Sequence, residues 1–284
     1  MVHTARHPKP GETLLGHGGE ITAGGKGANQ AVAAALLGTP VTFVGAVGSD
    51  AYAAPAMHYL KASGVNLEHV ARTDEVTGLA VITVDEQGEN TIIVVPGANA
   101  LVDAPFVTTH SSPITESELV LLQGEIPAEG FAKAIELATG RIVINLAPVI
   151  AVDKDALLRA DPLLANEHEA GLILEEFGLS AKGTPEELAQ RLREAGFASV
   201  VLTLGARGAL VTEGTDLVAV PSPQVTPVDT TGAGDAFAGA LCARLLKGDS
   251  LVEAARYAAR VGAFAVTGAG AQASYPDRDT ELPS

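Results

Sequence analysis

The sequence is poor in cysteine, in aromatic residues and in basic charge. Its one cysteine, Cys242, leaves no disulfide framework and no zinc site built from several thiolates. Tryptophan is absent and aromatic residues make up 4%, so few rings are available for stacking on nucleic-acid bases. The 34 acidic residues outnumber the 18 basic ones, and a net charge of −16 repels phosphate backbones and anionic lipids. We therefore expect neither a nucleic-acid partner nor a membrane partner.

Long apolar runs are also missing, although apolar residues are abundant. Gly, Pro, Asp or Arg interrupts every stretch that approaches a membrane span, and residues 1–16 lack the apolar core of a signal peptide. Hydrophobic residues make up 47% of the 284 residues, which is enough to bury a large core. We expect a single cytoplasmic domain over residues 1–284, with Cys242 in its core.

Short β-branched runs alternate with stretches rich in Ala, Leu and Glu, which predicts an α/β fold. The runs are apolar almost throughout, as in a parallel sheet that is covered on both faces. We expect strands at 41–47, 119–123, 141–148 and 199–205, and helices at 127–140 and 184–196. Residues 78–95 differ, because two strands flank a glycine-containing turn with no helix between them. This hairpin and the extended start of the chain predict a small separate β-layer.

The segment around Asp235 carries the clearest chemical signal. Gly232, Ala233 and Gly234 precede a predicted helix, whose free N–H groups and dipole favour an anion such as phosphate. Asp235 follows at once, and a carboxylate beside an anion site can take a proton from an attacking hydroxyl. The alternative is that Asp235 caps the helix and that the glycines form a plain turn.

A second glycine cluster precedes an Ala-rich helix at residues 22–38. It is neither a P-loop nor a dinucleotide fingerprint, because the spacing matches neither motif. Gly24 and Gly25 can admit a polyol close to the backbone, where Lys26 and Asn29 supply hydrogen bonds. The alternative is a flexible turn before a packed helix.

Three further positions lie where strands end. Asn166 and Glu169 are three residues apart at a helix start, so their oxygens share one face and can hold Mg²⁺ through its water ligands. For Asn166 the alternative is an N-cap. The turn at 203–208 can wrap a nucleotide or be only a turn. Glu125 ends a strand at the sheet edge where ligands collect, or is an exposed carboxylate.

Together these segments resemble the ribokinase-like (PfkB) carbohydrate kinase family over nearly the whole chain. In family order, the matching stretches are PGETLLG, GGKGANQAVAAA, GENTIIVVPGANA, NEHEA, TLGARG and DTTGAGDAFAGA. The resemblance implies a Rossmann-like, mostly parallel sheet with helices on both faces. It also implies a small β-sheet lid, with strands within 1–22 and 77–97, that often forms a homodimer interface. The implied reaction is ATP-dependent phosphorylation of the 5-hydroxyl of D-ribose. The alternatives are a kinase for another sugar or a nucleoside, and a nucleotide-binding form with impaired catalysis.

The resemblance also implies a role for individual residues. Asp235 corresponds to the base, and the N–H groups of Gly232, Ala233 and Gly234 correspond to the anion hole. The sugar contacts correspond to Gly25, Lys26, Asn29, Glu125 and Asp235, and the ATP contacts to Asn166, Thr203, Gly205, Gly208 and Gly234. Glu169 corresponds to a support for Mg²⁺ through water. An activating K⁺ site corresponds to Asp229, Thr231, Ala265, Gly268, Gly270 and Ser274, and K⁺ there would fix the loop that shapes the anion hole.

The sequence departs from the family pattern at two places. Family members begin with a central strand that ends in an Asn-x-Asp motif, whose Asp binds the sugar hydroxyls. This sequence begins with Met1 about where that strand would have ended, so we expect the first central strand to be missing from the sheet. Ala259 stands where relatives carry a polar residue near the adenine.

Overall fold

The computed structural model describes residues 1–214 and 216–284, and its main sheet has six strands. The strand order is β12-β11-β10-β9-β8-β7, in which β7 to β10 are parallel and the last two are antiparallel. Their bounds are β7 (Leu119–Gln123), β8 (Arg141–Asn145), β9 (Leu163–Asn166), β10 (Val200–Thr203), β11 (Ala209–Glu213) and β12 (Asp216–Val220). The mostly parallel α/β architecture is confirmed.

Helices cover both faces of this sheet and enclose two apolar cores. Val143, Leu164 and Val201 point to one core, whereas their strand neighbours Ile144 and Leu202 point to the other, as the two-residue period of a strand requires. The first core is covered by α1 (Lys26–Leu36), α10 (Ala233–Leu245) and α11 (Leu251–Ala265). The second is covered by α6 (Ala128–Leu137), α8 (Glu167–Glu176) and α9 (Pro185–Glu194).

Shorter helices complete the layers. They are α2 (Ala53–Ala56), α3 (His58–Ala62), α4 (Ala104–Thr109), α5 (Ser112–Glu116) and α7 (Lys154–Leu157), with 3-10 turns η1 (Gly97–Leu101), η2 (Gly205–Arg207) and η3 (Gln272–Ser274). Within the described residues, no helix is long and apolar enough to cross a membrane.

Most predicted segments contain an element of the expected type, but several elements are shorter than predicted. β8 ends at Asn145 rather than at 148, and β10 covers Val200–Thr203 rather than 199–205. The strand at 119–123 and the helix with Thr184 as N-cap are confirmed, and Thr184 forms a capping box with Glu187. A continuous strand over 41–47 is wrong, because β3 is limited to Gly45–Gly48. Thr42 makes an isolated bridge to Asn66, and the parallel ladder resumes only at Gly45. Hydrogen bonding is therefore interrupted in the first half of that segment.

The parallel layer is divided into two hydrogen-bonded pieces. β3 pairs with β4 (Val70–Thr73), and the six-stranded sheet ends at β7. In the described part of the chain no strand pairs with the outer edge of β7.

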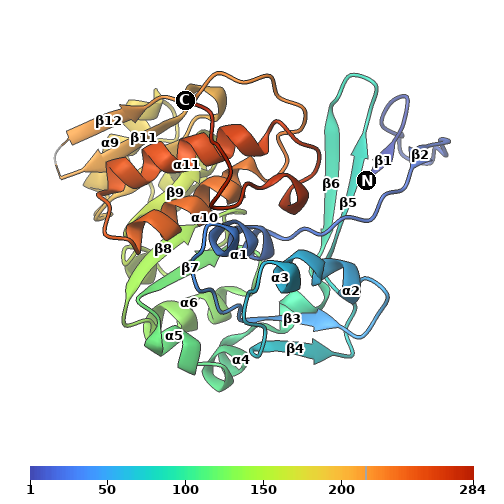
Figure 1. Cartoon of the computed structure of the whole chain (residues 1–284), viewed down its shortest axis with the longest axis horizontal. Coiled ribbons are helices and arrows are strands. Elements are labelled where there is room, and N and C mark those ends of the chain that lie inside the picture. The colour runs from blue at the N-terminus through green and yellow to red at the C-terminus, as the bar shows by residue number, and fades with distance from the viewer. Residues whose placement is uncertain (215) are drawn as a thin grey trace.

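A separate four-stranded sheet projects from the body of the molecule beside the N-terminus (Figure 1). We call it the lid. Its order is β2-β1-β5-β6, with bounds β1 (Val2–His3), β2 (His17–Gly18), β5 (Leu79–Val84) and β6 (Asn90–Val95). The expected hairpin is β5–β6, paired from Leu79 with Val95 to Val84 with Asn90.

Candidate active site

Each parallel strand of the main sheet ends in a polar residue, and these ends share one edge. The last residues are Gln123 of β7, Asn145 of β8, Asn166 of β9 and Thr203 of β10. The register places Gln123 beside Asn145 and Asn166 beside Thr203. Ligands of open α/β sheets collect at the carboxyl ends of the strands, so this edge locates the candidate site.

The start of α10 forms the floor of the site. Gly232 is the N-cap with a φ of 75°, a left-handed conformation that glycine adopts without steric cost. Tyr275 Oη donates to the Gly232 carbonyl at 2.9 Å, which fixes this turn. A side chain added at Gly234 would meet no atom within 4 Å, so a ligand can approach the backbone there.

Three predicted N–H groups of the anion hole differ in their partners. The N–H of Ala233 donates to the Thr230 carbonyl at 3.3 Å. Among the described residues, no carbonyl oxygen accepts a hydrogen bond from the N–H groups of Gly232 and Gly234. Free N–H groups at the start of a 13-residue helix are suited to an anion.

Asp235 lies in the first turn of α10 and is buried, with 7% of its surface exposed. Its Oδ2 accepts from Asn29 Nδ2 at 2.8 Å, and its Oδ1 accepts from Gln30 Nε2 at 2.9 Å. Burial raises the pKa of Asp235 above its ordinary value, although the charge of Lys26 and the two amide donors oppose that rise. A carboxylate with a raised pKa is better suited to accept a proton than an exposed one.

The start of α1 faces Asp235 from the opposite side. The helix begins at Lys26, with Gly25 as N-cap at a φ of 89°. The N–H of Lys26 donates to Glu125 Oε2 at 2.7 Å, and a side chain at Gly25 would lie 3.9 Å from that oxygen. Burial raises the pKa of Glu125, and the negative charge of Asp235 raises it further. The hydrogen bond from the Lys26 N–H and the positive charge of Lys26 oppose this rise. The structure thus brings the predicted sugar contacts together, while their role stays a prediction.

The predicted nucleotide contacts lie farther along the same edge. Asn166 is the N-cap of α8 and forms a capping box with Glu169: Asn166 Oδ1 accepts the Glu169 N–H at 2.8 Å, and Glu169 Oε2 accepts the Asn166 N–H at 2.9 Å. The capping alternative for Asn166 is thus what the structure contains. Thr203 leads into η2, where Gly205 has a φ of 58° and Gly208 a φ of 94°. Gly205 is exposed near the ends of β9 and β10, whereas Gly208 is buried against the backbone of Val220 and Ser222. The ATP role of these positions stays a prediction.

The loops predicted to hold K⁺ are joined by hydrogen bonds. Asp229 Oδ1 accepts the Thr231 N–H at 2.9 Å, and Asp229 Oδ2 accepts the Gly270 N–H at 2.9 Å. Burial alone would raise the pKa of Asp229, but these hydrogen bonds lower it below its usual value. Ser274 Oγ donates to the Gly270 carbonyl at 2.9 Å, and the Gly268 N–H donates to the Ala265 carbonyl at 3.4 Å.

Asp229, Thr231, Gly270 and Ser274 are therefore joined by hydrogen bonds near the Gly232 turn. The turn from Ala265 to Gly268 packs beside them, since a side chain at Gly268 would lie 2.9 Å from Ser274 Cβ. One carboxylate and several carbonyl oxygens are donors of the kind that hard cations take. Within the described residues, no three His, Cys, Asp or Glu side chains gather as a metal cluster. The support of Mg²⁺ by Glu169 through water stays a prediction.

The sequence analysis missed four amides that surround Asp235. Gln30 Nε2 also donates to Asn145 Oδ1 at 2.8 Å, and Gln30 Oε1 accepts from Gln123 Nε2 at 2.6 Å. Gln272 Nε2 donates to Asn29 Oδ1 at 2.8 Å. The signal available was the polar residue at the end of each buried strand, at Gln123 and Asn145.

Two other positions lie in the core. Cys242 is buried, and burial raises the pKa of its thiol to about 12, which confirms the predicted core position. Ala259 is also buried, with 4% exposed, in the core beneath α11.

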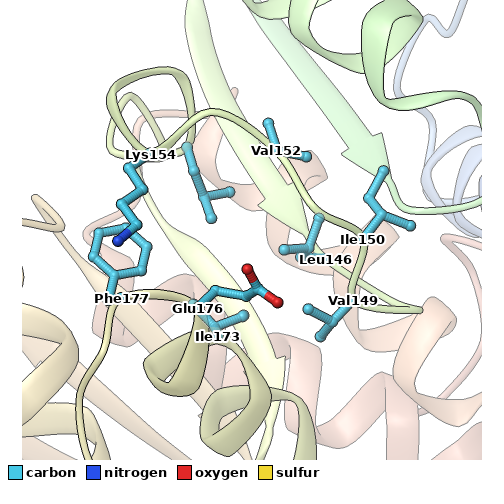
Figure 2. A pocket seen from close by; sticks show the side chains of 9 residues that line it. Leu146, Val149, Ile150, Val152, Lys154, Ile173, Glu176 and Phe177 are labelled. Carbon is cyan, nitrogen blue, oxygen red and sulfur yellow. The ribbon is translucent and has the colours of Figure 1, made fainter.

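A small cavity elsewhere does not belong to the site. It has a volume of about 20 Å³ and lies between the segment after β8 and α8, where none of the candidate site residues lines it. Figure 2 shows the Glu176 carboxylate pointing toward apolar side chains there, among them Val149 and Ile173. Such a volume has room for about one water molecule, which is too small for a sugar.

The model of the pfkB family of carbohydrate kinases matches residues 2–278. The ribokinase of Bacillus subtilis is 36% identical over 285 residues, which cover 98% of this chain and 93% of that protein. The chain therefore belongs to the pfkB family of carbohydrate kinases, as predicted, and is an ATP-dependent sugar kinase by that membership.

Solved structures agree with this assignment. A ribokinase from Thermotoga maritima has a TM-score of 0.90 at 33% identity and covers 98% of this chain and 92% of its own. An Arabidopsis thaliana ribokinase complexed with ribose and ATP has a TM-score of 0.88 at 30% identity, with the same coverage of 98% and 92%.

Proposed function

We propose that this chain transfers the γ-phosphoryl group of ATP to the 5-hydroxyl of D-ribose. One observation carries the proposal: the buried Asp235 carboxylate lies in the first turn of α10, directly after the free N–H groups of Gly232 and Gly234. A proton acceptor and an anion site are thus adjacent, as in-line phosphoryl transfer requires. The names of the similar ribokinases, one of them complexed with ribose and ATP, support ribose as the acceptor.

In this mechanism the chain positions two substrates and moves one proton. Gly25, Lys26, Asn29 and Glu125 bind the sugar hydroxyls, and Asp235 takes the proton of the 5-hydroxyl as that oxygen attacks phosphorus. The N–H groups of Gly232, Ala233 and Gly234 stabilise the charge that develops on the transferred group. The N–H of Ala233 exchanges its 3.3 Å contact with Thr230 for the phosphate.

The nucleotide is held at the other half of the edge. Asn166, Thr203, Gly205 and Gly208 contact ATP, and Gly234 lies where its phosphates meet α10. Glu169 would support Mg²⁺ through a water ligand, and a bound Mg²⁺ would neutralise charge on the phosphates. Asp229, Thr231, Ala265, Gly268, Gly270 and Ser274 would hold K⁺, and their hold would stiffen the Gly232 turn.

The lid also supports a proposed homodimer. Five aliphatic side chains of β5 and β6 are 40% exposed or more: Val81, Ile92, Ile93, Val94 and Val95. Because successive side chains of a strand alternate, Val81, Ile93 and Val95 share one face of the hairpin, and Ile92 and Val94 lie on the other. Exposed apolar side chains gathered in this way mark an association site more often than free surface. A second copy of this chain is the partner proposed for it.

The test is ADP production from MgATP, with D-ribose, 2-deoxyribose, other sugars and nucleosides offered in turn, with and without K⁺. We expect turnover that depends on D-ribose and increases with K⁺. Faster turnover with another acceptor would replace ribose with that acceptor. Nucleotide binding without turnover on any acceptor would overturn the proposal in favour of an impaired, nucleotide-binding form.

A further inference from the structure

The amide side chains around Asp235 form two branches, one from each carboxylate oxygen. From Oδ2 the branch runs through Asn29 to Gln272. From Oδ1 it runs to Gln30, and from Gln30 to both Gln123 and Asn145. Asn145 Nδ2 in turn donates to the Leu164 carbonyl at 3.1 Å.

The ionised carboxylate determines how every amide in these branches is oriented. Because an ionised carboxylate only accepts hydrogen bonds, Asn29 and Gln30 must present their NH₂ groups to it. Their oxygens then face away and accept from Gln272 and Gln123. No amide in the network can turn over without losing a hydrogen bond, so the network fits the ionised form of Asp235.

The two branches differ in how firmly they end. The Asn29 branch ends at Gln272, whose Oε1 is buried and has no hydrogen-bond partner within the described residues. Asn29 in this branch is also a predicted sugar contact. Gln30 is fully buried, with 0% exposed. Its amide oxygen accepts from Gln123 at the end of β7, and its amide nitrogen donates to Asn145 at the end of β8. The Gln30 branch is therefore anchored on the main sheet and does not depend on the substrate.

Gly239 allows this arrangement by bringing α10 close to α1. A side-chain carbon at Gly239 would lie 2.6 Å from the Gln30 carbonyl oxygen and 2.7 Å from Ala33 Cβ. Because position 239 lies one helical turn after Asp235, the missing side chain lets Asp235 come within hydrogen-bond distance of Gln30.

We propose that Gln30 is a positioning residue for Asp235: anchored by Gln123 and Asn145, its amide holds one carboxylate oxygen and keeps the group ionised, so that the other oxygen is presented to the sugar hydroxyl. This proposal rests on the proposed role of Asp235 as the base. It adds to that role a residue that touches neither substrate.

The charged groups around Asp235 do not duplicate this effect. Lys26, in the first turn of α1, favours the ionised carboxylate, whereas Glu125, after β7, is a like charge that disfavours it. Tyr275, after η3, has a pKa that burial and the charge of Asp235 raise, so it stays neutral. All three groups are unchanged when Gln30 is replaced, so a changed pH profile reports on the amide itself.

The test compares the pH dependence of kcat in the full chain and in a Gln30→Met variant, which keeps the length of the side chain but removes the donor. Loss of a donor to a carboxylate raises its pKa, so the acidic limb of the profile moves to higher pH. We expect kcat to fall about tenfold on the acidic side of the original midpoint and much less at alkaline pH. KM for the sugar should change little. Gln190→Met, which removes an exposed amide of α9, is the matched control.

An acidic limb at its original pH in Gln30→Met would overturn the proposal, because a purely structural amide lowers kcat equally at every pH. Gln123→Met is the second variant, in case the first does not fold. It leaves Gln30 in place without its anchor, so we expect a smaller displacement in the same direction. If Gln30→Met is unfolded, an original profile in Gln123→Met overturns the proposal.

The Asp235→Asn variant distinguishes the positioning role of Gln30 from the proposed role of Asp235 as the base. Retained turnover in that variant would remove the base role itself. Loss of turnover there, together with an original profile in Gln30→Met and Gln123→Met, would remove only the positioning role.

Discussion

Around Asp235 the chain buries four amide side chains, whereas β6 of the lid exposes four successive aliphatic side chains to solvent. The amides Asn29, Gln30, Asn145 and Gln272 are at most 8% exposed, and Ile92 to Val95 are at least 41% exposed. Both patterns reverse the usual placement of polar and apolar residues.

The proposed function accounts for each reversal by what the region would bind. Buried amides are tolerated where each has partners, and here those partners hold a carboxylate. Exposed aliphatic side chains are tolerated where another surface covers them. Polar groups in the core and apolar groups on the surface thus single out these two regions for functional tests, because local departures from the usual pattern are expected at functional sites.

The largest effect is expected at the carboxylate. Asp235→Asn should lower kcat about 10²- to 10⁴-fold, because the general base is lost, while ATP affinity stays nearly unchanged. Steady-state turnover and nucleotide titration measure the two quantities. Asp277→Asn, at an exposed carboxylate near the C-terminus, is the control and should be active. Comparable turnover in the two variants would show that the buried polar region is structural only.

The next effect concerns the close approach of α1 and α10. Gly239→Ala should lower the free energy of unfolding by about 1–3 kcal/mol, because the new carbon would overlap the Gln30 carbonyl and Ala33. In α11 the same change at Gly262 meets its nearest atom at 3.4 Å, so it should stabilise the chain by up to about 1 kcal/mol through helix propensity. Urea unfolding compares the pair, and a gain at both positions would contradict the packing argument.

A smaller effect is expected in the lid. Ile93→Glu should weaken self-association about tenfold or more, because it places a charge on the exposed aliphatic surface. Leu217→Glu replaces an aliphatic side chain of β12 that is 38% exposed outside the lid, and should leave association unchanged. Sedimentation over a range of concentrations measures both. Equal association in the two variants would show that the lid does not form the self-association interface.

The smallest effect is a predicted lack of reaction. At pH 8 the Cys242 thiol, with a pKa of about 12, is almost entirely protonated and is also buried, so a thiol reagent should modify it only after unfolding. In a Leu217→Cys variant the new thiol, on β12 outside the lid, should react at once. Rapid modification of Cys242 in the native protein would show that the core beneath α10 opens far more readily than the packing indicates.

The sequence indicated those parts of the molecule that depend on local pattern. Strand β7, the hairpin β5–β6 and the helix start before Asp235 follow from apolar periodicity and glycine placement. The Asn166–Glu169 pair follows from a three-residue spacing, although local spacing did not distinguish a capping box from a metal support.

The remaining features depend on contacts between distant segments. Nothing near Gln30 in the sequence indicates that its amide reaches Asp235, because the contact requires α1 to cross α10 at Gly239. The interrupted strand at 41–47 likewise depends on where Asn66 and Val70 pair with it. Periodicity describes one segment at a time and therefore misses both.

The contact between Asn29 and Gln272 has a consequence for synthesis of the protein. The two residues are 243 positions apart, yet their amides are hydrogen-bonded beside Asp235. A chain still emerging from the ribosome can form β3, β4 and α1 early, but it lacks the last wall of the site until η3 has been made. A ligand that needs the complete Asp235 site therefore stabilises the chain only after η3 has been made.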